Sequence, residues 1–180
     1  MDCSEPTVAE LGSTSHTSKE TSGTRILSAE TKAIVNSTAP ALQQHGVAIT
    51  QRLVEPLFVD PAVKAMFDEA AQESGEQPRR LAAAILAYAQ NIEKLEALTA
   101  PVMPMAARHV ETGVKPEHYP MVAHALLPAI RDILGDTATD DVLAAWGEAF
   151  WALAEILIGK EAAMYAEVAS GSLPVPASQH

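Results

Sequence analysis

Apolar residues recur at helical spacing through the body of this chain, and no segment alternates like a half-buried strand. The longest stripe belongs to a helix that should begin near Thr139 or Asp140. Its apolar members are Val142, Leu143, Trp146, Phe150, Leu153 and Leu157. A second clear stripe occupies residues 117–134. The pattern predicts an all-α chain of seven or eight helices with no sheet.

Small polar residues and prolines mark the expected starts of the early helices. Ser28 is a suitable N-cap, and Pro40 should break or kink the helix that it opens. Asp60-Pro61 combines a cap with a first-turn proline, and should open a short helix to Phe67. The polar stretch 68–76 is expected to be a loop.

Two further helices are expected in the middle of the chain. Gln77-Pro78 repeats the first-turn-proline signal and opens a helix with Leu81 and Ile85 on one face. A short helix over 98–111 carries His109 near its end, just before a turn that contains a glycine. A histidine in this position is a candidate metal ligand.

Composition favours one domain, at residues 27–169, between polar tails at 1–26 and 170–180 that are expected to be disordered. The net charge of −11 disfavours nucleic acid and anionic membrane surfaces as partners. Cys3 is the only cysteine, so an internal disulfide is excluded and a reducing cytoplasm is the expected location. The most apolar segment, 142–158, contains two glutamates and is not expected to span a membrane.

Five segments together resemble one family: the single-domain bacterial haemoglobins and the globin domain of flavohaemoglobins. They are Gln77-Pro78-Arg79-Arg80-Leu81, Ala89-Gln90-Asn91-Ile92-Glu93, His118-Tyr119-Pro120, Thr139-Asp140-Asp141 and Ala145-Trp146-Gly147-Glu148-Ala149-Phe150. The resemblance covers about residues 27–169. It implies a three-over-three globin fold around a haem b that is held without covalent attachment.

The resemblance assigns roles residue by residue. His109 matches the proximal iron ligand, and Tyr119 matches a proximal tyrosine that supports it and serves catalysis. Phe67 matches the phenylalanine that packs on the porphyrin, while Gln77 and Leu81 match the distal pair near the bound gas. Further cofactor contacts are expected from Ile85, Val54, Val122 and Leu126.

Two departures from the family pattern are expected to matter. The distal tyrosine of the family is replaced by Val54 or by Leu53, depending on which side the alignment is counted from. The carboxylate that pairs with the proximal tyrosine aligns with Ala163. Glu161 should point about 200° away from that position and therefore elsewhere.

These features predict a globin that reversibly binds dioxygen, nitric oxide and carbon monoxide. Weak nitric oxide dioxygenase activity is expected only with an external reductase, and an enzymatic role stays open. The alternatives are a non-catalytic globin for gas sensing or protein interaction, and an engineered haem carrier with an opened distal pocket. A homodimer is compatible with such a domain. Of the other histidines, His45 and His118 are expected to be exposed, His124 lies on the helix after the ligand, and His16 and His180 are in the tails.

Overall fold

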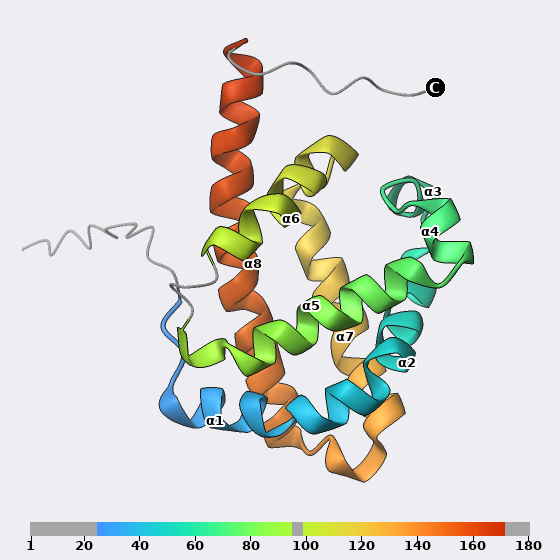
Figure 1. Cartoon of the computed structure of the whole chain (residues 1–180), viewed down its shortest axis with the longest axis vertical. Coiled ribbons are helices and arrows are strands. Elements are labelled where there is room, and N and C mark those ends of the chain that lie inside the picture. The colour runs from blue at the N-terminus through green and yellow to red at the C-terminus, as the bar shows by residue number, and fades with distance from the viewer. Residues whose placement is uncertain (1–24, 95–98, 172–180) are drawn as a thin grey trace, which may run out of the picture.

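A computed structural model describes residues 25–94 and 99–171 of the chain. This part contains eight α-helices and no strand, which confirms the all-α prediction (Figure 1). The α-helices are α1 (Ala29–Ser37), α2 (Ala39–Leu57), α3 (Pro61–Lys64), α4 (Glu69–Glu73), α5 (Glu76–Gln90), α6 (Thr99–Thr112), α7 (Tyr119–Leu134) and α8 (Asp140–Ala169). Two 3₁₀ turns, η2 (Pro116–His118) and η3 (Gly135–Thr137), flank α7.

Local capping explains most helix boundaries. The Ser28 hydroxyl accepts a hydrogen bond from the Thr31 backbone N–H at 3.0 Å and so starts α1. The expected break near Pro40 falls at Thr38, which ends α1 and begins α2. The Asp60 carboxylate caps α3 by accepting from the Ala62 N–H at 2.9 Å.

The predicted loop at 68–76 was wrong in part. The Asp68 carboxylate accepts a hydrogen bond from the Ala71 N–H at 3.1 Å, and this cap supports the short helix α4. The helix before it is shorter than expected, because α3 ends at Lys64 and the chain turns before Phe67. Residues 65–68 therefore form a bend between α3 and α4, and Phe67 within this bend lines the cavity described below.

Helix α2 crosses both α5 and α7, while α6 and α1 pack on the long α8 (Figure 1). The crossing of α2 and α5 is close: a Cβ atom at Gly46 would lie 3.2 Å from the Ala82 Cβ atom. Beside it, the buried Thr50 hydroxyl is 3.0 Å from the carbonyl of Pro78. This contact fixes the first turn of α5 and hence the place of Gln77.

Buried polar groups tie the helices together. The indole N–H of Trp146 donates to the Thr38 hydroxyl at 3.1 Å, and the Tyr88 hydroxyl donates to the Ala149 carbonyl at 2.7 Å. Both bonds are buried, where an unpaired polar group would be costly. They hold α8 against the junction of α1 with α2 and against α5.

Among the described helices, α8 is long and apolar enough to cross a membrane by length and composition alone. Six of its apolar residues belong to the buried core of the domain. They are Ala145, Trp146, Ala149, Ala152, Ala154 and Leu157.

The two predicted tails lie almost entirely outside the described residues, as do Cys3 and the expected helix start at Leu98. The domain boundaries at 27 and 169 therefore stay predictions. Within the described part, α8 ends at Ala169, the last residue of the predicted domain.

Candidate functional site

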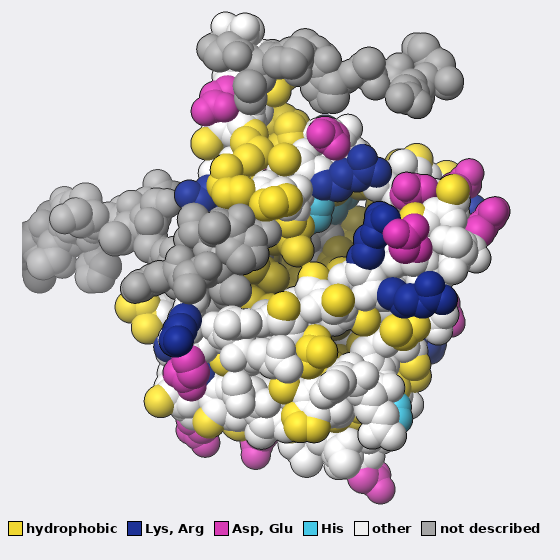
Figure 2. Space-filling model, viewed as in Figure 1, with side chains coloured by type: hydrophobic (Ala, Val, Ile, Leu, Met, Phe, Trp, Pro, Cys, Tyr) yellow, Lys and Arg dark blue, Asp and Glu magenta, His cyan; other side chains and the backbone are white. Residues whose placement is uncertain are grey.

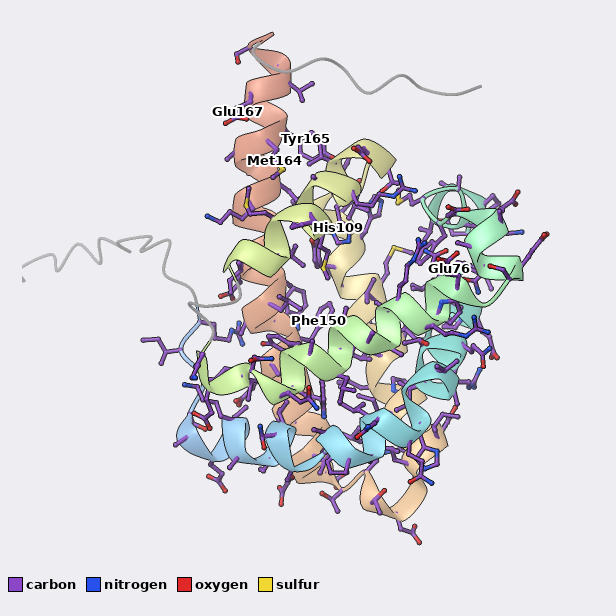
Figure 3. The ribbon with its side chains drawn as sticks, in the orientation of Figure 1. Glu76, His109, Phe150, Met164, Tyr165 and Glu167 are labelled. Carbon is purple, nitrogen blue, oxygen red and sulfur yellow. The ribbon has the colours of Figure 1, made fainter. Side chains whose placement is uncertain are left out.

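A cavity of about 460 Å³ lies between α5 and α6, with α7 and α8 behind it. Figure 2 shows it as a hollow with basic side chains at its rim and a histidine inside. His109 extends from α6 into the gap toward α5 (Figure 3). Eight sequence-predicted site residues line it: Phe67, Gln77, Leu81, Ile85, His109, Tyr119, Val122 and Leu126.

The imidazole of His109 is oriented by a buried carboxylate. Its Nδ1 atom lies 2.7 Å from Oε1 of Glu161, whose side chain is 2% exposed. With Nδ1 donating to a carboxylate, the unprotonated Nε2 of a neutral ring is left free to bind a metal from the cavity side. A carboxylate in this position also makes the imidazole a stronger ligand.

Tyr119 completes this cluster from the first turn of α7. Its hydroxyl donates to the same Glu161 oxygen at 2.6 Å and lies 3.2 Å from Nδ1 of His109. Burial, reinforced by the hydrogen bond to Glu161 and by its negative charge, raises the pKa of Tyr119 well above the usual tyrosine value. The hydroxyl therefore stays protonated and acts as a donor.

The expectation that Ala163 takes the carboxylate position, with Glu161 pointing elsewhere, was wrong. Ala163 is exposed, and Glu161 faces the histidine. The register of α8 explains this: eleven residues after Phe150, which lines the cavity, the helix has made about three full turns. The two positions do point in opposite directions, but it is Glu161 that points inward.

On the distal side, Gln77 lines the cavity from the first turn of α5, and its Oε1 atom is buried without a hydrogen-bond partner. Leu53 also lines the cavity. Val54 is buried but is not among the lining residues, so its predicted contact with the cofactor is corrected in favour of Leu53. No hydroxyl stands at this position of α2.

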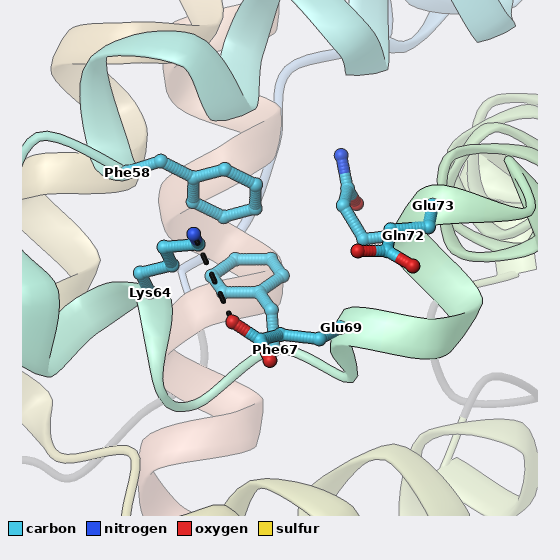
Figure 4. A pocket seen from close by; sticks show the side chains of 6 residues that line it. All are labelled: Phe58, Lys64, Phe67, Glu69, Gln72 and Glu73. Atoms are coloured by element: carbon cyan, nitrogen blue, oxygen red, sulfur yellow. Dashed lines mark ion pairs between the residues drawn. The ribbon is translucent and has the colours of Figure 1, made fainter.

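Phe67 is held in place by a second aromatic ring that sequence reasoning missed. The Phe58 and Phe67 rings meet edge to face, with centroids 5.0 Å apart. A smaller pocket of about 230 Å³ lies beside them, and the 3.8 Å ion pair of Lys64 with Glu69 crosses it (Figure 4). Phe58 directly follows α2, which was its only sequence signal.

The cavity contains further residues whose roles the sequence did not indicate. Phe150, expected to be part of the apolar core, and His118, expected to be exposed, both line the cavity. Arg80 from α5 and Arg108 from α6 also line it, with side chains that are 67% and 59% exposed. The two guanidinium groups thus lie toward the solvent edge of an otherwise largely apolar cavity.

These residues fit a haem. In the described part of the chain, no group of three or more His, Cys, Asp or Glu residues could hold a metal ion. His109, whose Nδ1 is bonded to a buried carboxylate, leaves its other ring nitrogen free on the side of a largely apolar cavity, and such an imidazole is what a globin offers to haem iron. Gln77 lines the same cavity with an Oε1 atom that has no hydrogen-bond partner, and Arg80 and Arg108 suit the two carboxylates of the haem.

An all-helical domain whose largely apolar cavity is lined by an imidazole bonded to a buried carboxylate is typical of a haem-binding globin. The globin family matches residues 52–157, which is more than half of the chain. The chain belongs to this family. The match confirms the resemblance, the fold and the haem cofactor predicted from the sequence.

Individual relatives agree with this assignment. A flavohemoprotein of Rhizobium meliloti is 46% identical over 141 residues, which are 78% of this chain and 35% of that protein. This chain therefore spans about a third of the length of such relatives.

Two solved structures cover their own chains almost completely. A bacterial globin from Campylobacter jejuni is 40% identical, with a TM-score of 0.72 over 77% of this chain and 99% of that one. An engineered carbene transferase, made from an inferred nitric oxide dioxygenase of Rhodothermus marinus, is 39% identical, with a TM-score of 0.74 over 80% and 99%.

Proposed function

We propose that this globin reversibly binds dioxygen, nitric oxide and carbon monoxide at a haem held by His109. The observation that carries the proposal is the hydrogen-bonded cluster of His109, Tyr119 and Glu161 in the wall of a largely apolar cavity that Gln77 also lines. When bound, the haem supplies an iron that takes a gas on the face opposite the histidine.

The side chains around the iron have separable tasks. Glu161 holds the proton of His109 at Nδ1, and the Tyr119 hydroxyl supports the same carboxylate oxygen. Gln77 offers an amide N–H to the polar end of a bound gas. Apolar side chains such as Leu53 and Leu81 keep water from the distal side but offer no hydrogen bond to the bound gas.

We further propose nitric oxide dioxygenase activity that depends on an external electron donor. The His109–Tyr119–Glu161 cluster supports this, because an electron-rich histidine favours chemistry at the iron as well as gas binding. The relatives lend support as well. One is called flavohemoprotein, and a flavohemoglobin of Malassezia yamatoensis, 32% identical, has a solved structure with bound FAD and haem.

Leu53 favours a second candidate, a non-catalytic gas-binding globin used for sensing. The absence of a distal hydroxyl removes one hydrogen bond to bound dioxygen and should lower the affinity for dioxygen. The affinity for carbon monoxide should fall less, because carbon monoxide is less polar. A reducing cytoplasm is the proposed location in either case, since the chain has a single cysteine.

The purified chain loaded with haem distinguishes these functions. Carbon monoxide should shift the main haem absorption band of the reduced protein, and a reductase should drive consumption of nitric oxide in the presence of dioxygen. Gas binding without turnover would favour the sensing role. A protein that takes up no haem would overturn both candidates. His109→Ala should lose the histidine-ligated haem spectrum, and His124→Ala, which removes an exposed histidine, is its control.

A further inference from the structure

Two residues of α8, one helical turn apart, lie next to the turn that carries His109. Glu161 bonds the imidazole, and Tyr165, four residues later, bonds the backbone just after α6. Positions i and i+4 share one face of a helix, so both side chains reach the same neighbour. Figure 3 shows His109 and Tyr165 with α6 and α8 behind them.

The end of α6 forms a compact turn in which the backbone of His109 is engaged. The Val114 N–H donates to the His109 carbonyl at 2.8 Å, and the Gly113 N–H donates to the Val110 carbonyl at 3.2 Å. Gly113 has φ 79°, in the left-handed region that this type of helix ending requires. The position of Val114 is therefore coupled directly to that of the ligand residue.

Tyr165 fixes the other end of Val114. Its hydroxyl donates to the Val114 carbonyl at 2.7 Å. Burial and the nearby charge of Glu161 raise the pKa of Tyr165, so its hydroxyl stays protonated as the bond requires. A continuous path thus runs from Tyr165 through both polar groups of Val114 to the backbone of His109.

We propose that Tyr165 is a positioning residue for the iron ligand: through Val114 it fixes the backbone of His109, while Glu161 fixes the ring. Helix α8 then holds the histidine at two points. A single hydrogen bond at Nδ1 leaves the ring able to tilt with its backbone, whereas a second point on the backbone restricts this tilt. The proposal rests on the proposed function, because its main readout needs haem.

The test is Tyr165→Phe, with Thr38→Val as the control. Each change removes one side-chain hydroxyl that donates to a backbone carbonyl, that of Val114 at 2.7 Å for Tyr165 and that of Val35 at 2.6 Å for Thr38, and Thr38 does not line the cavity. Amide hydrogen exchange in the haem-free and haem-loaded protein is measured at Val114 and His109. Resonance Raman of the reduced protein reports the iron–histidine stretch.

We expect Tyr165→Phe to speed exchange of the Val114 amide by about fivefold to tenfold, the effect of losing one hydrogen bond of typical net strength. The iron–histidine band should broaden or shift. Thr38→Val should lower thermal stability but leave both unchanged.

An unchanged band and unchanged Val114 exchange in Tyr165→Phe would overturn the positioning role. Equal changes in both variants would overturn it as well, because they would indicate general loosening. Should Tyr165→Phe fail to fold, Val114 exchange in the unmodified protein decides. A protection factor higher than that of Gly113 supports the clamp, and an equal or lower protection factor contradicts it. A chain that binds no haem would overturn the proposed function, while exchange at Val114 would still test the clamp.

Discussion

The Nδ1 atom of His109 lies 2.7 Å from Oε1 of Glu161, although the two residues are 52 positions apart and sit on different helices. The carboxylate is almost fully buried, and its other oxygen has no hydrogen-bond partner. Desolvation of an ionised carboxylate is costly unless it is well paired. The position of Glu161 is therefore best explained by its action on the histidine.

Replacing Glu161 by Gln should weaken electron donation to the iron. An amide oxygen is a poorer acceptor than a carboxylate, so the hydrogen bond that Nδ1–H donates to residue 161 becomes weaker. The imidazole then carries less negative charge and donates less electron density to the iron. The iron–histidine stretch should fall, and nitric oxide turnover with it. Ala163→Glu is the control: position 163 is exposed, so this change should leave the stretch where it is. A stretch that changes in Ala163→Glu but not in Glu161→Gln would show that position 163, and not Glu161, faces the histidine.

A tyrosine at position 53 should slow the release of dioxygen. A new hydroxyl hydrogen bond to a polarised ligand contributes about 1.5–3 kcal/mol, or roughly one to two powers of ten in affinity. Carbon monoxide affinity should change less. In Val54→Tyr the new side chain should point into the core instead, and mainly lower stability. Stopped-flow release kinetics measure the effect, and equal rates in Leu53→Tyr and the unmodified chain would show that Gln77 already serves as the donor.

Stability should fall at alkaline pH partly because of Tyr119. Burial, together with Glu161, raises the pKa of Tyr119 above its ordinary value near 10. Above pH 10 the unfolded chain loses this proton while the folded chain keeps it, so rising pH favours unfolding. Tyr119→Phe should therefore show a shallower fall between pH 9 and about 11 in denaturant titrations. Parallel curves for the two proteins would contradict the raised pKa of Tyr119.

Esterified haem should be lost faster than ordinary haem. Arg80 and Arg108 lie at the solvent edge of the cavity and suit the two carboxylates, which the dimethyl ester lacks. We expect transfer to an excess of apomyoglobin to speed up by about tenfold, in line with the loss of a charge-assisted bond. Arg80→Gln should speed loss of ordinary haem but not of the ester, while Arg131→Gln, whose partner is Asp140, should change neither. Equal rates of loss for the two haems would show that Arg80 and Arg108 do not bind the haem carboxylates.

Local chemistry made much of the fold predictable. Ser28, Asp60 and Thr139 each cap a helix with their own side chain, and such signals need no knowledge of the rest of the molecule. Helix α4 was missed because it is short and polar, with no apolar stripe. Its cap at Asp68 was the one signal, and a single acidic residue is common in loops too.

The errors at the site come from rotation and register, which sequence patterns specify poorly. Glu161 continues the apolar stripe of α8 one turn after Leu157, but apolar residues on other sides of the helix near its centre, such as Trp151, obscure that stripe. Counting turns from Phe150 gives the answer only once Phe150 is known to line the cavity. Leu53 and Val54 are both apolar and both buried, and a 100° step of the helix decides which one meets the ligand. Packing of α2 against α5 and α7 fixes that step.

Rescue of His109→Gly by free imidazole tests the central claim most directly. The variant should lose the absorption spectrum of a reduced, histidine-ligated haem, and added imidazole should restore it in the space left beside Glu161. Restoration should fail, or need far more imidazole, when Glu161→Gln is added, because the carboxylate orients the ring. A normal histidine-ligated spectrum in His109→Gly without imidazole would contradict the assignment of His109 as the iron ligand.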